Sequence, residues 1–149
     1  MADSNSFVHT WAPRLLSVLR IISGFLLMQH GLQKVFGMLT PPAAPGAPPP
    51  PGFNLFSLIG VAGVLELVGG LLLILGLFTR PTAFILSGLM AAAYFMAHAP
   101  QGFWSVLNKG ELAALYSFVY LYLAAAGGGE WSLDRLIGRD RPAHLAAAR

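Results

Sequence analysis

The sequence predicts an all-α integral membrane protein, a four-helix bundle whose N- and C-termini both lie in the cytoplasm. Three observations lead to this class. Hydrophobic residues make up 56% of the chain and charged residues only 10%, which is too apolar for a soluble domain of ordinary composition. The apolar residues fall into runs that approach the length of about 20 needed to cross a bilayer as a helix. Most arginines lie at alternate span ends, as expected for segments that stay in the cytoplasm.

Composition also excludes several chemistries. The chain has no cysteine, which rules out disulfide exchange, thiolate nucleophiles, iron–sulfur ligation and cysteine-based zinc sites. A redox role therefore needs a bound cofactor, a quinone or a partner subunit. The formal charge of +3 comes from arginines near the membrane ends, so no nucleic-acid partner is predicted. The N-terminus lacks the pattern of a cleavable signal, and the first span is expected to stay in the mature protein.

The first predicted span covers residues 15–39. A polar tail that ends at Thr10 precedes it, and Trp11 and Arg14 follow the tail and mark the membrane boundary. A helix turns about 100° per residue, so the charged and small residues of this span share one face, which should point inward. That face consists of Arg20, Gly24, Leu27, His30, Gly31 and Lys34. Residues 40–52 follow as an uncharged segment rich in Pro and Gly, where we expect an extended loop.

The second predicted span, residues 54–78, carries one carboxylate, Glu66, well inside an apolar run. A carboxylate near the middle of a bilayer costs on the order of 3 kcal/mol to insert, so Glu66 should face protein or a wet cavity and have a partner. Gly69 and Gly70 lie on the same side and allow a neighbouring backbone to approach closely. That neighbour is either another helix of the same bundle or a second protomer, so a homo-oligomer is an alternative.

Two further spans are predicted at residues 82–98 and 111–126, after a tight turn at residues 79–81. The loop between them, residues 99–110, contains Trp104 and is expected to form a short interfacial helix. Tyr94 and His98 share a face in the third span, and in the fourth span Glu111 and Tyr122 lie opposite Tyr116 and Tyr120.

The tail, residues 127–149, begins with three glycines that end the last helix, and Ser132 is placed to cap a short C-terminal amphipathic helix. The positions of Lys and Arg set the orientation. The basic residues on the cytoplasmic side are Arg14, Arg80, Arg135, Arg139, Arg141 and Arg149. Lys109, with Lys34 near its span end, lies on the other side. Residues 1–149 are thus interpreted as one membrane domain.

Most ionisable residues of the predicted spans converge on the outer half of the bundle. At about 1.5 Å per residue, His30 and Glu66 both lie roughly 13 to 17 Å below the outer boundary, so an imidazole and a carboxylate from neighbouring helices are expected to meet. Lys34, His98 and Glu111 lie nearer the same face. A buried ionisable pair at this depth marks a pathway or a site, with a structural ion pair between two helices as the alternative.

Other interpretations are open for several of these residues. Lys34 and Arg20 are long enough to snorkel to the headgroups, and His98 and Glu111 are close enough to span ends to be interfacial. Histidines and carboxylates are also metal-ligand types, but no Glu-x-x-His pair lies on one helix, so no metal site is predicted. A haem would need His30 or His98 as its axial ligand, and nothing else favours one.

Three segments of the chain resemble the DoxX family of small bacterial four-helix membrane proteins, and the likeness extends over residues 15–134. The segments are LRIISGFLLMQHGLQKVFG, GVLELVGGLLLILGLFTRPTA and NKGELAALYSFVYLYLAAAGGGEWSLD. The motif residues are Arg20, His30, Gly31, Lys34, Glu66, Gly69, Gly70, Asn108, Gly110, Glu111 and the closing Trp131, Ser132, Leu133 and Asp134. The resemblance implies a bacterial inner-membrane location and a redox association, because a relative is a subunit of an archaeal thiosulfate:quinone oxidoreductase.

We therefore expect a redox-associated membrane subunit with an outward-facing polar pocket that binds quinone or quinol. The residues expected to exchange protons with the ligand are His30, Glu66, Lys34, His98 and Glu111, and those expected to help bind it are Arg20, Tyr94, Asn108 and Tyr122. The pKa values of His and Glu can be brought near working pH by burial and neighbouring charge. The alternatives are a small permease or binding protein for an apolar or cationic solute, and a docking subunit of a membrane oxidoreductase complex.

Overall fold

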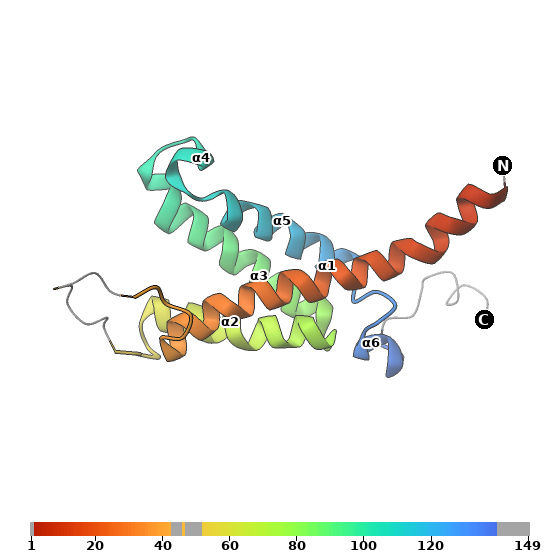
Figure 1. Ribbon diagram of the computed structural model, residues 1–149, viewed down its shortest axis with the longest axis horizontal. Coiled ribbons are helices and arrows are strands. Elements are labelled where there is room, and N and C mark those ends of the chain that lie inside the picture. Colours follow the sequence, from red (N-terminus) through yellow and green to blue (C-terminus); the bar gives the residue numbers. More distant parts are fainter. Residues whose placement is uncertain (1, 43–45, 47–51, 140–149) are drawn as a thin grey trace.

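A computed structural model of the protein describes residues 2–42, 46 and 52–139 (Figure 1). This part of the chain is built from helices and contains no strand, which confirms the all-α class. Three helices are long and apolar enough to cross a membrane, and they cover Phe7–Phe36, Leu58–Leu75 and Thr79–Gln101. A shorter apolar helix covers Glu111–Ala126.

The elements in chain order are α1 (Ala2–Phe36), α2 (Leu58–Leu75), α3 (Thr79–Ala93), the π-helical turn η1 (Tyr94–His98), the 3-10 turn η2 (Ala99–Gln101), α4 (Ser105–Asn108), α5 (Glu111–Ala126) and α6 (Leu133–Leu136). The last predicted span agrees with α5 at both ends, whereas α2 is shorter than predicted at each end. Most of the predicted loop 40–52, and Arg141 and Arg149 of the tail, lie outside the described residues.

Helix α1 begins earlier than predicted, because residues 2–14, expected as a tail, are helical. No residue between Phe7 and Ala12 breaks a helix. Pro13 lies inside α1, and its carbonyl accepts a hydrogen bond from the Ser17 hydroxyl at 2.9 Å. This N-terminal part of α1 extends past the other helices (Figure 1). At its other end α1 stops at Phe36, before a glycine with a left-handed φ of 65°.

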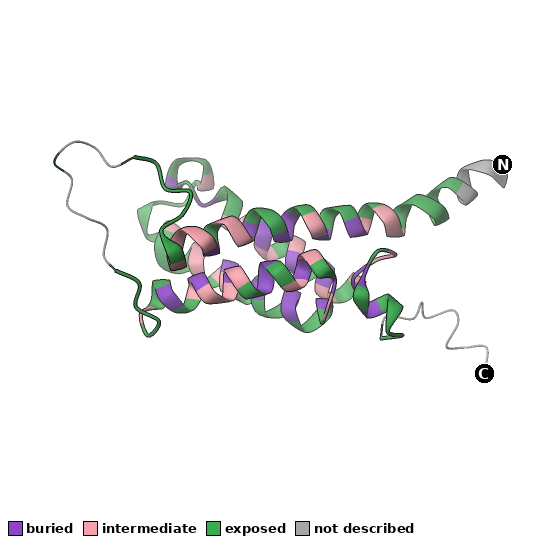
Figure 2. Ribbon diagram, turned by 60° about the horizontal axis from the view of Figure 1, so that its bottom comes forward, coloured by how far each residue is buried: buried purple, intermediate pink, exposed green. Residues whose placement is uncertain are grey.

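Helices α1 and α2 lie side by side and antiparallel (Figures 1 and 2), and glycines let their backbones approach closely. A Cβ atom added at Gly70 of α2 would lie 2.7 Å from the carbonyl oxygen of Gly24 of α1. On the next turns of α2, a Cβ at Gly63 would lie 2.8 Å from the Cβ of Lys34. These glycines therefore serve a contact within the bundle, and the interpretation in which they meet a second protomer is wrong.

Helix α3 packs along α5, and the two helix pairs share one core. The Ser87 hydroxyl of α3 donates to the Ser117 carbonyl of α5 at 2.8 Å. The Tyr120 hydroxyl of α5 donates to the Ser23 carbonyl of α1 at 2.9 Å, which ties the second pair to the first. The core residues are Leu27, Leu73, Ala83, Leu86, Met90, Tyr116, Tyr120 and Leu123.

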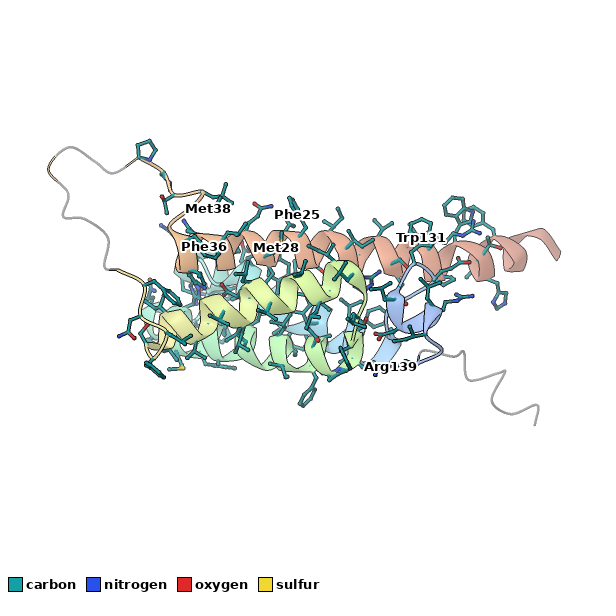
Figure 3. All side chains as sticks on the ribbon, turned by 90° about the horizontal axis from the view of Figure 1, so that it is seen from below. Phe25, Met28, Phe36, Met38, Trp131 and Arg139 are labelled. Carbon is teal, nitrogen blue, oxygen red and sulfur yellow. The ribbon has the colours of Figure 1, made fainter. Side chains whose placement is uncertain are left out.

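The outer faces of the helices carry large apolar side chains, and the buried residues face inward (Figure 2). Phe25 points away from the other helices (Figure 3), and Phe84 and Phe118 are 67% and 71% exposed. A soluble protein rarely exposes so continuous an apolar surface to water, whereas lipid tails are as apolar as these side chains and can cover it. The surface and the helix lengths together require a lipid environment.

The start of α1 and the single turn α6 lie at one end of the bundle, and α4 lies at the opposite end with the loop that joins α1 to α2 (Figure 1). We call these the terminal end and the loop end. Helix α6 begins at the predicted cap, because the Ser132 hydroxyl accepts a hydrogen bond from the Arg135 amide at 3.2 Å.

Candidate functional site

A polar cavity of about 240 Å³ lies near the loop end, between α1, α2, α3 and α5. Its polar lining residues are His30 and Lys34 of α1, Glu66 of α2, His98 of η1, Lys109 of the loop before α5, and Tyr116 of α5. Leu27, Met90, Ala93, Leu112 and Ala113 form its apolar wall. The fold thus brings together, in one cavity, four of the five residues predicted to exchange protons, namely His30, Lys34, Glu66 and His98.

The partner of Glu66 is Lys34. The Lys34 Nζ lies 2.6 Å from Oε1 of Glu66, whose side chain is only 4% exposed. The sequence predicts His30 as the partner, and this is wrong. His30 and Lys34 lie on the same face of α1, one turn apart, and the longer side chain of Lys34 reaches the carboxylate. His30 lines the cavity and is itself exposed. The ion pair also argues against a Lys34 side chain that simply snorkels, since its charge is held within the bundle.

The second oxygen of Glu66, Oε2, is buried and has no hydrogen-bond partner among the described residues. A buried charged oxygen without a donor is costly, by about 1–3 kcal/mol or more. Glu66 lines the polar cavity, so its carboxylate, with this unsatisfied oxygen, borders a space that can hold a ligand. Lys34 therefore satisfies only half of the carboxylate.

His98 is positioned by its local backbone. Its Nδ1 lies 2.9 Å from the carbonyl oxygen of Asn108, and because a carbonyl only accepts, Nδ1 carries the hydrogen and Nε2 of the neutral ring is left as an acceptor. Asn108 is buried, and its side chain donates to Gly102 at 2.7 Å and accepts from the Gly110 amide at 2.8 Å. Asn108 is therefore a positioning residue for His98 and does not line the cavity.

The chain is shaped to hold His98 there. Helix α3 continues into a π-helical turn that ends at His98, and such turns are frequent at functional sites. A Cβ atom added at Gly110 would lie 2.8 Å from the Cβ of His98 and 2.8 Å from Cδ2 of Tyr94. Tyr94 thus packs behind the histidine, with its ring edge-on to Phe95 at 5.3 Å, and does not line the cavity as predicted.

Two predicted residues of α5 face away from the cavity, and two polar lining residues, Lys109 and Tyr116, were not predicted. Glu111 and Tyr122 are exposed on the outer face of α5, and Glu111 borders a separate surface hollow with Lys109. Tyr116 follows Glu111 by five positions, which is about 140° around the helix, and it faces inward. Tyr116 and Tyr120 are buried and their rings stack at 5.5 Å, so their side of α5 is the inner face. The sequence already placed these two tyrosines opposite Glu111, and this could have indicated that Glu111 faces outward.

Arg20 is at the terminal end, far along α1 from the cavity, and it neither snorkels nor lines the ligand space. It is fully buried, and its guanidinium donates to main-chain carbonyls of four residues. These are Gly128 at 2.8 Å, Ile74 at 2.9 Å, Trp131 at 2.6 Å, and Leu73. Arg20 does not line the polar cavity with the other predicted residues, and its donors join α1 to the end of α2 and to the C-terminal segment.

The polar cavity offers more donors than acceptors. Lys34, Lys109, Tyr116 and His30 can donate hydrogen bonds, whereas Glu66 carries the single carboxylate and His98 offers Nε2 as an acceptor. Such a lining suits a ligand with oxygen atoms. The described residues contain no cluster of three or more potential metal ligands.

The sequence model of the DoxX family matches residues 15–99. An uncharacterized protein of Haemophilus influenzae is 43% identical over 85% of this chain and 93% of its own length. The inner membrane protein YqjF of Escherichia coli is 32% identical, over 82% of this chain and 91% of its own. The uncharacterized membrane protein Rv3486 of Mycobacterium tuberculosis is 27% identical, over 93% and 95%. No solved structure matches the chain.

Proposed function

Because this chain belongs to the DoxX family of membrane proteins, we propose that it is a redox-associated subunit whose polar cavity binds the head group of a quinone or quinol. It is a multi-pass protein of the bacterial inner membrane, in keeping with its relatives and its three long apolar helices. The observation that carries the proposal is the ion pair between the buried Glu66 and the partly exposed Lys34, beside two histidines in a cavity of a lipid-embedded bundle.

The size of the cavity favours a single-ring head group. Pockets for drug-sized ligands measure about 300–1,000 Å³, and this cavity, at about 240 Å³, is smaller. A quinone is a membrane-dissolved redox carrier with a small polar ring and a long apolar tail. The ring would enter among the polar groups, and the tail would stay with the exposed apolar faces of the helices and the lipid.

The residues around the ring are suited to proton transfer. Imidazole and carboxylate side chains can both accept and release protons, so His30, His98 and Glu66 are placed to exchange protons with a ligand in the cavity. Quinone chemistry moves two protons with two electrons, and these side chains would exchange the protons. Electrons would come from or go to a partner subunit, because the chain has no cysteine to supply them.

A cationic solute is less well matched to this lining. Lys34 and Lys109 both border the cavity, and Lys34 already neutralises the single carboxylate at 2.6 Å. A second cation would meet net repulsion. The permease alternative for such solutes therefore has no support from the arrangement of charges.

The proposal includes four crossings with both termini in the cytoplasm. Helix α5 has 16 residues, or about 24 Å at about 1.5 Å per residue, and it lies antiparallel to α3 as a fourth, short crossing of a locally thinned bilayer. Single cysteines introduced at Thr40 or Lys109 should react with a membrane-impermeant maleimide from outside, and one at Gly138 should not. Labelling of Gly138→Cys in intact spheroplasts would reverse the orientation.

A cavity-filling variant tests the function without touching any charge. Ala93→Phe places a ring in the cavity that Ala93 lines, so binding of decylubiquinone to protein in nanodiscs, measured by calorimetry, should fall at least tenfold, by about 1.4 kcal/mol. Ala92→Phe adds the same ring at the preceding, exposed position, and this variant should bind decylubiquinone as the wild type does. Equal binding by all three proteins, or none by the wild type, would end the proposal.

A further inference from the structure

We infer that the polar cavity prefers the reduced ligand, a quinol, over the oxidised quinone, and that Oε2 of Glu66 makes the distinction. The inference rests on the proposed function and adds the redox form that the site selects. It starts from the buried oxygen of Glu66 that has no hydrogen-bond partner among the described residues. The side chain is 4% exposed and lines the cavity.

The Lys34–Glu66 geometry fixes what Oε2 can do. Lys34 has only donors and occupies Oε1 at 2.6 Å. Oε2 is the second oxygen of the carboxylate that pairs with Lys34, so it accepts hydrogen bonds, and a donor for it would have to come from a ligand. The amide and hydroxyl groups of neighbouring helices do not supply one in the described part of the chain.

The two redox forms differ in their donors. A quinone presents carbonyl oxygens, which only accept hydrogen bonds. Its carbonyl oxygen and Oε2 of the carboxylate would then face each other as two acceptors with no hydrogen between them. A quinol presents hydroxyl groups, which donate as well as accept. The donors of the cavity, such as Lys109 and Tyr116, can serve the oxygens of both forms, so they do not discriminate between them.

A second acceptor in the cavity points the same way. The Nδ1 of His98 is held by the Asn108 carbonyl at 2.9 Å, which leaves Nε2 of the neutral ring as an acceptor. His98 lines the same cavity as Glu66. A ring with two hydroxyl groups matches a cavity whose wall offers two acceptors.

The preference should reverse when Glu66 becomes Gln. The amide oxygen of Gln would face Lys34, because Lys34 can only donate, and the amide NH₂ would take the place of Oε2. That position would then donate, which suits a quinone carbonyl. Glu111→Gln is the matched control, because Glu111 is an exposed carboxylate at the same end that does not line the polar cavity.

The test measures the affinities of decylubiquinol and decylubiquinone for the full-length protein in nanodiscs, by calorimetry under argon. Hydrogen bonds to charged groups are strong enough that the wild type and Glu111→Gln should bind the quinol at least about tenfold more tightly. Glu66→Gln should favour the quinone. The dimethyl ether of the quinol, which lacks donors, should bind the wild type no better than the quinone does, and this arm needs no variant to fold.

The outcomes separate the two proposals. If the wild type binds quinol and quinone equally, or binds the dimethyl ether as tightly as the quinol, the inferred selectivity is overturned and the quinone site stands. If the wild type binds none of the three compounds, the proposed function fails and the inference fails with it. An unchanged preference in a folded Glu66→Gln protein overturns the role of Oε2.

Discussion

The two ends of the bundle differ in how completely their buried charged side chains are hydrogen-bonded. At the terminal end, Arg20 is fully buried and donates to four main-chain carbonyls. Asp134 is buried close by, and its two oxygens accept from the amides of Phe78 at 2.9 Å and Thr79 at 2.7 Å. At the loop end, Glu66 is equally buried but has a partner for only one of its oxygens.

The difference teaches how to distinguish a structural charge from a functional one. A buried charge whose hydrogen bonds all end on the backbone holds segments together and has nothing left to offer a ligand. A buried charge that keeps an unsatisfied atom beside a cavity destabilises the protein and persists for another reason. By this criterion the hydrogen bonds of Arg20 and Asp134 at the terminal end form a structural clasp, and the loop end fits the proposed binding site.

The largest expected effect is at the clasp. Arg20→Met removes a buried cation and leaves four carbonyls without their donor, so the free energy of unfolding should fall by at least about 3 kcal/mol. Arg80→Met, at an exposed arginine that also donates to carbonyls, should lose less than about 1 kcal/mol. Denaturant unfolding in detergent, followed by circular dichroism, measures both. Similar losses in the two variants would contradict the assignment of Arg20 as the centre of the clasp.

A smaller loss is expected at Asp134. Its carboxylate caps the start of α3, and removal of a helix cap costs about 0.5–2 kcal/mol. Asp134→Ala should therefore lower stability by about that amount in the same unfolding assay. The control is Glu130→Ala, which breaks a partly exposed ion pair with Arg14 at 3.0 Å and should cost less than about 1 kcal/mol. A larger loss at Glu130 than at Asp134 would show that the surface pair, and not the cap, holds the C-terminal segment.

The smallest effect on stability is expected at the loop end, where function should disappear instead. Replacing Lys34 and Glu66 together by Met removes both charges, and apolar replacement of a buried ion pair is often neutral or stabilising by about 1–4 kcal/mol. The double variant should unfold no more easily than the wild type and should lose decylubiquinol binding. A clear loss of stability would mean that the pair is part of the structural framework, and the contrast between the two ends would break down.

Much of the fold could be predicted because it depends on patterns that sequence displays directly. Apolar run length located the helices, and α5 agrees with its predicted bounds. Glu66 stood out because a carboxylate in an apolar run has few explanations. The glycines beside it pointed to a close helix contact, and α1 makes that contact.

The rest depended on information that residue identities do not contain. Matching depth placed His30 and Glu66 at one level, but side-chain reach decided in favour of Lys34. The π-helical turn at the end of α3 changes the direction in which His98 points relative to a regular α-helix. Residue propensities do not predict such a turn. The partners of Arg20 are backbone carbonyls, which every residue carries, so residue identities do not show which segments Arg20 joins.

The clasp also orders events during synthesis. Arg20 lies in α1, while its acceptor at Gly128 is synthesised 108 positions later. Only the carbonyls of Leu73 and Ile74 become available earlier, so at roughly 5–20 residues per second the guanidinium of Arg20 lacks its acceptors in the C-terminal segment for on the order of ten seconds. A chain truncated before Gly128 would lack the carbonyls of Gly128 and Trp131, and its Arg20 would stay incompletely paired.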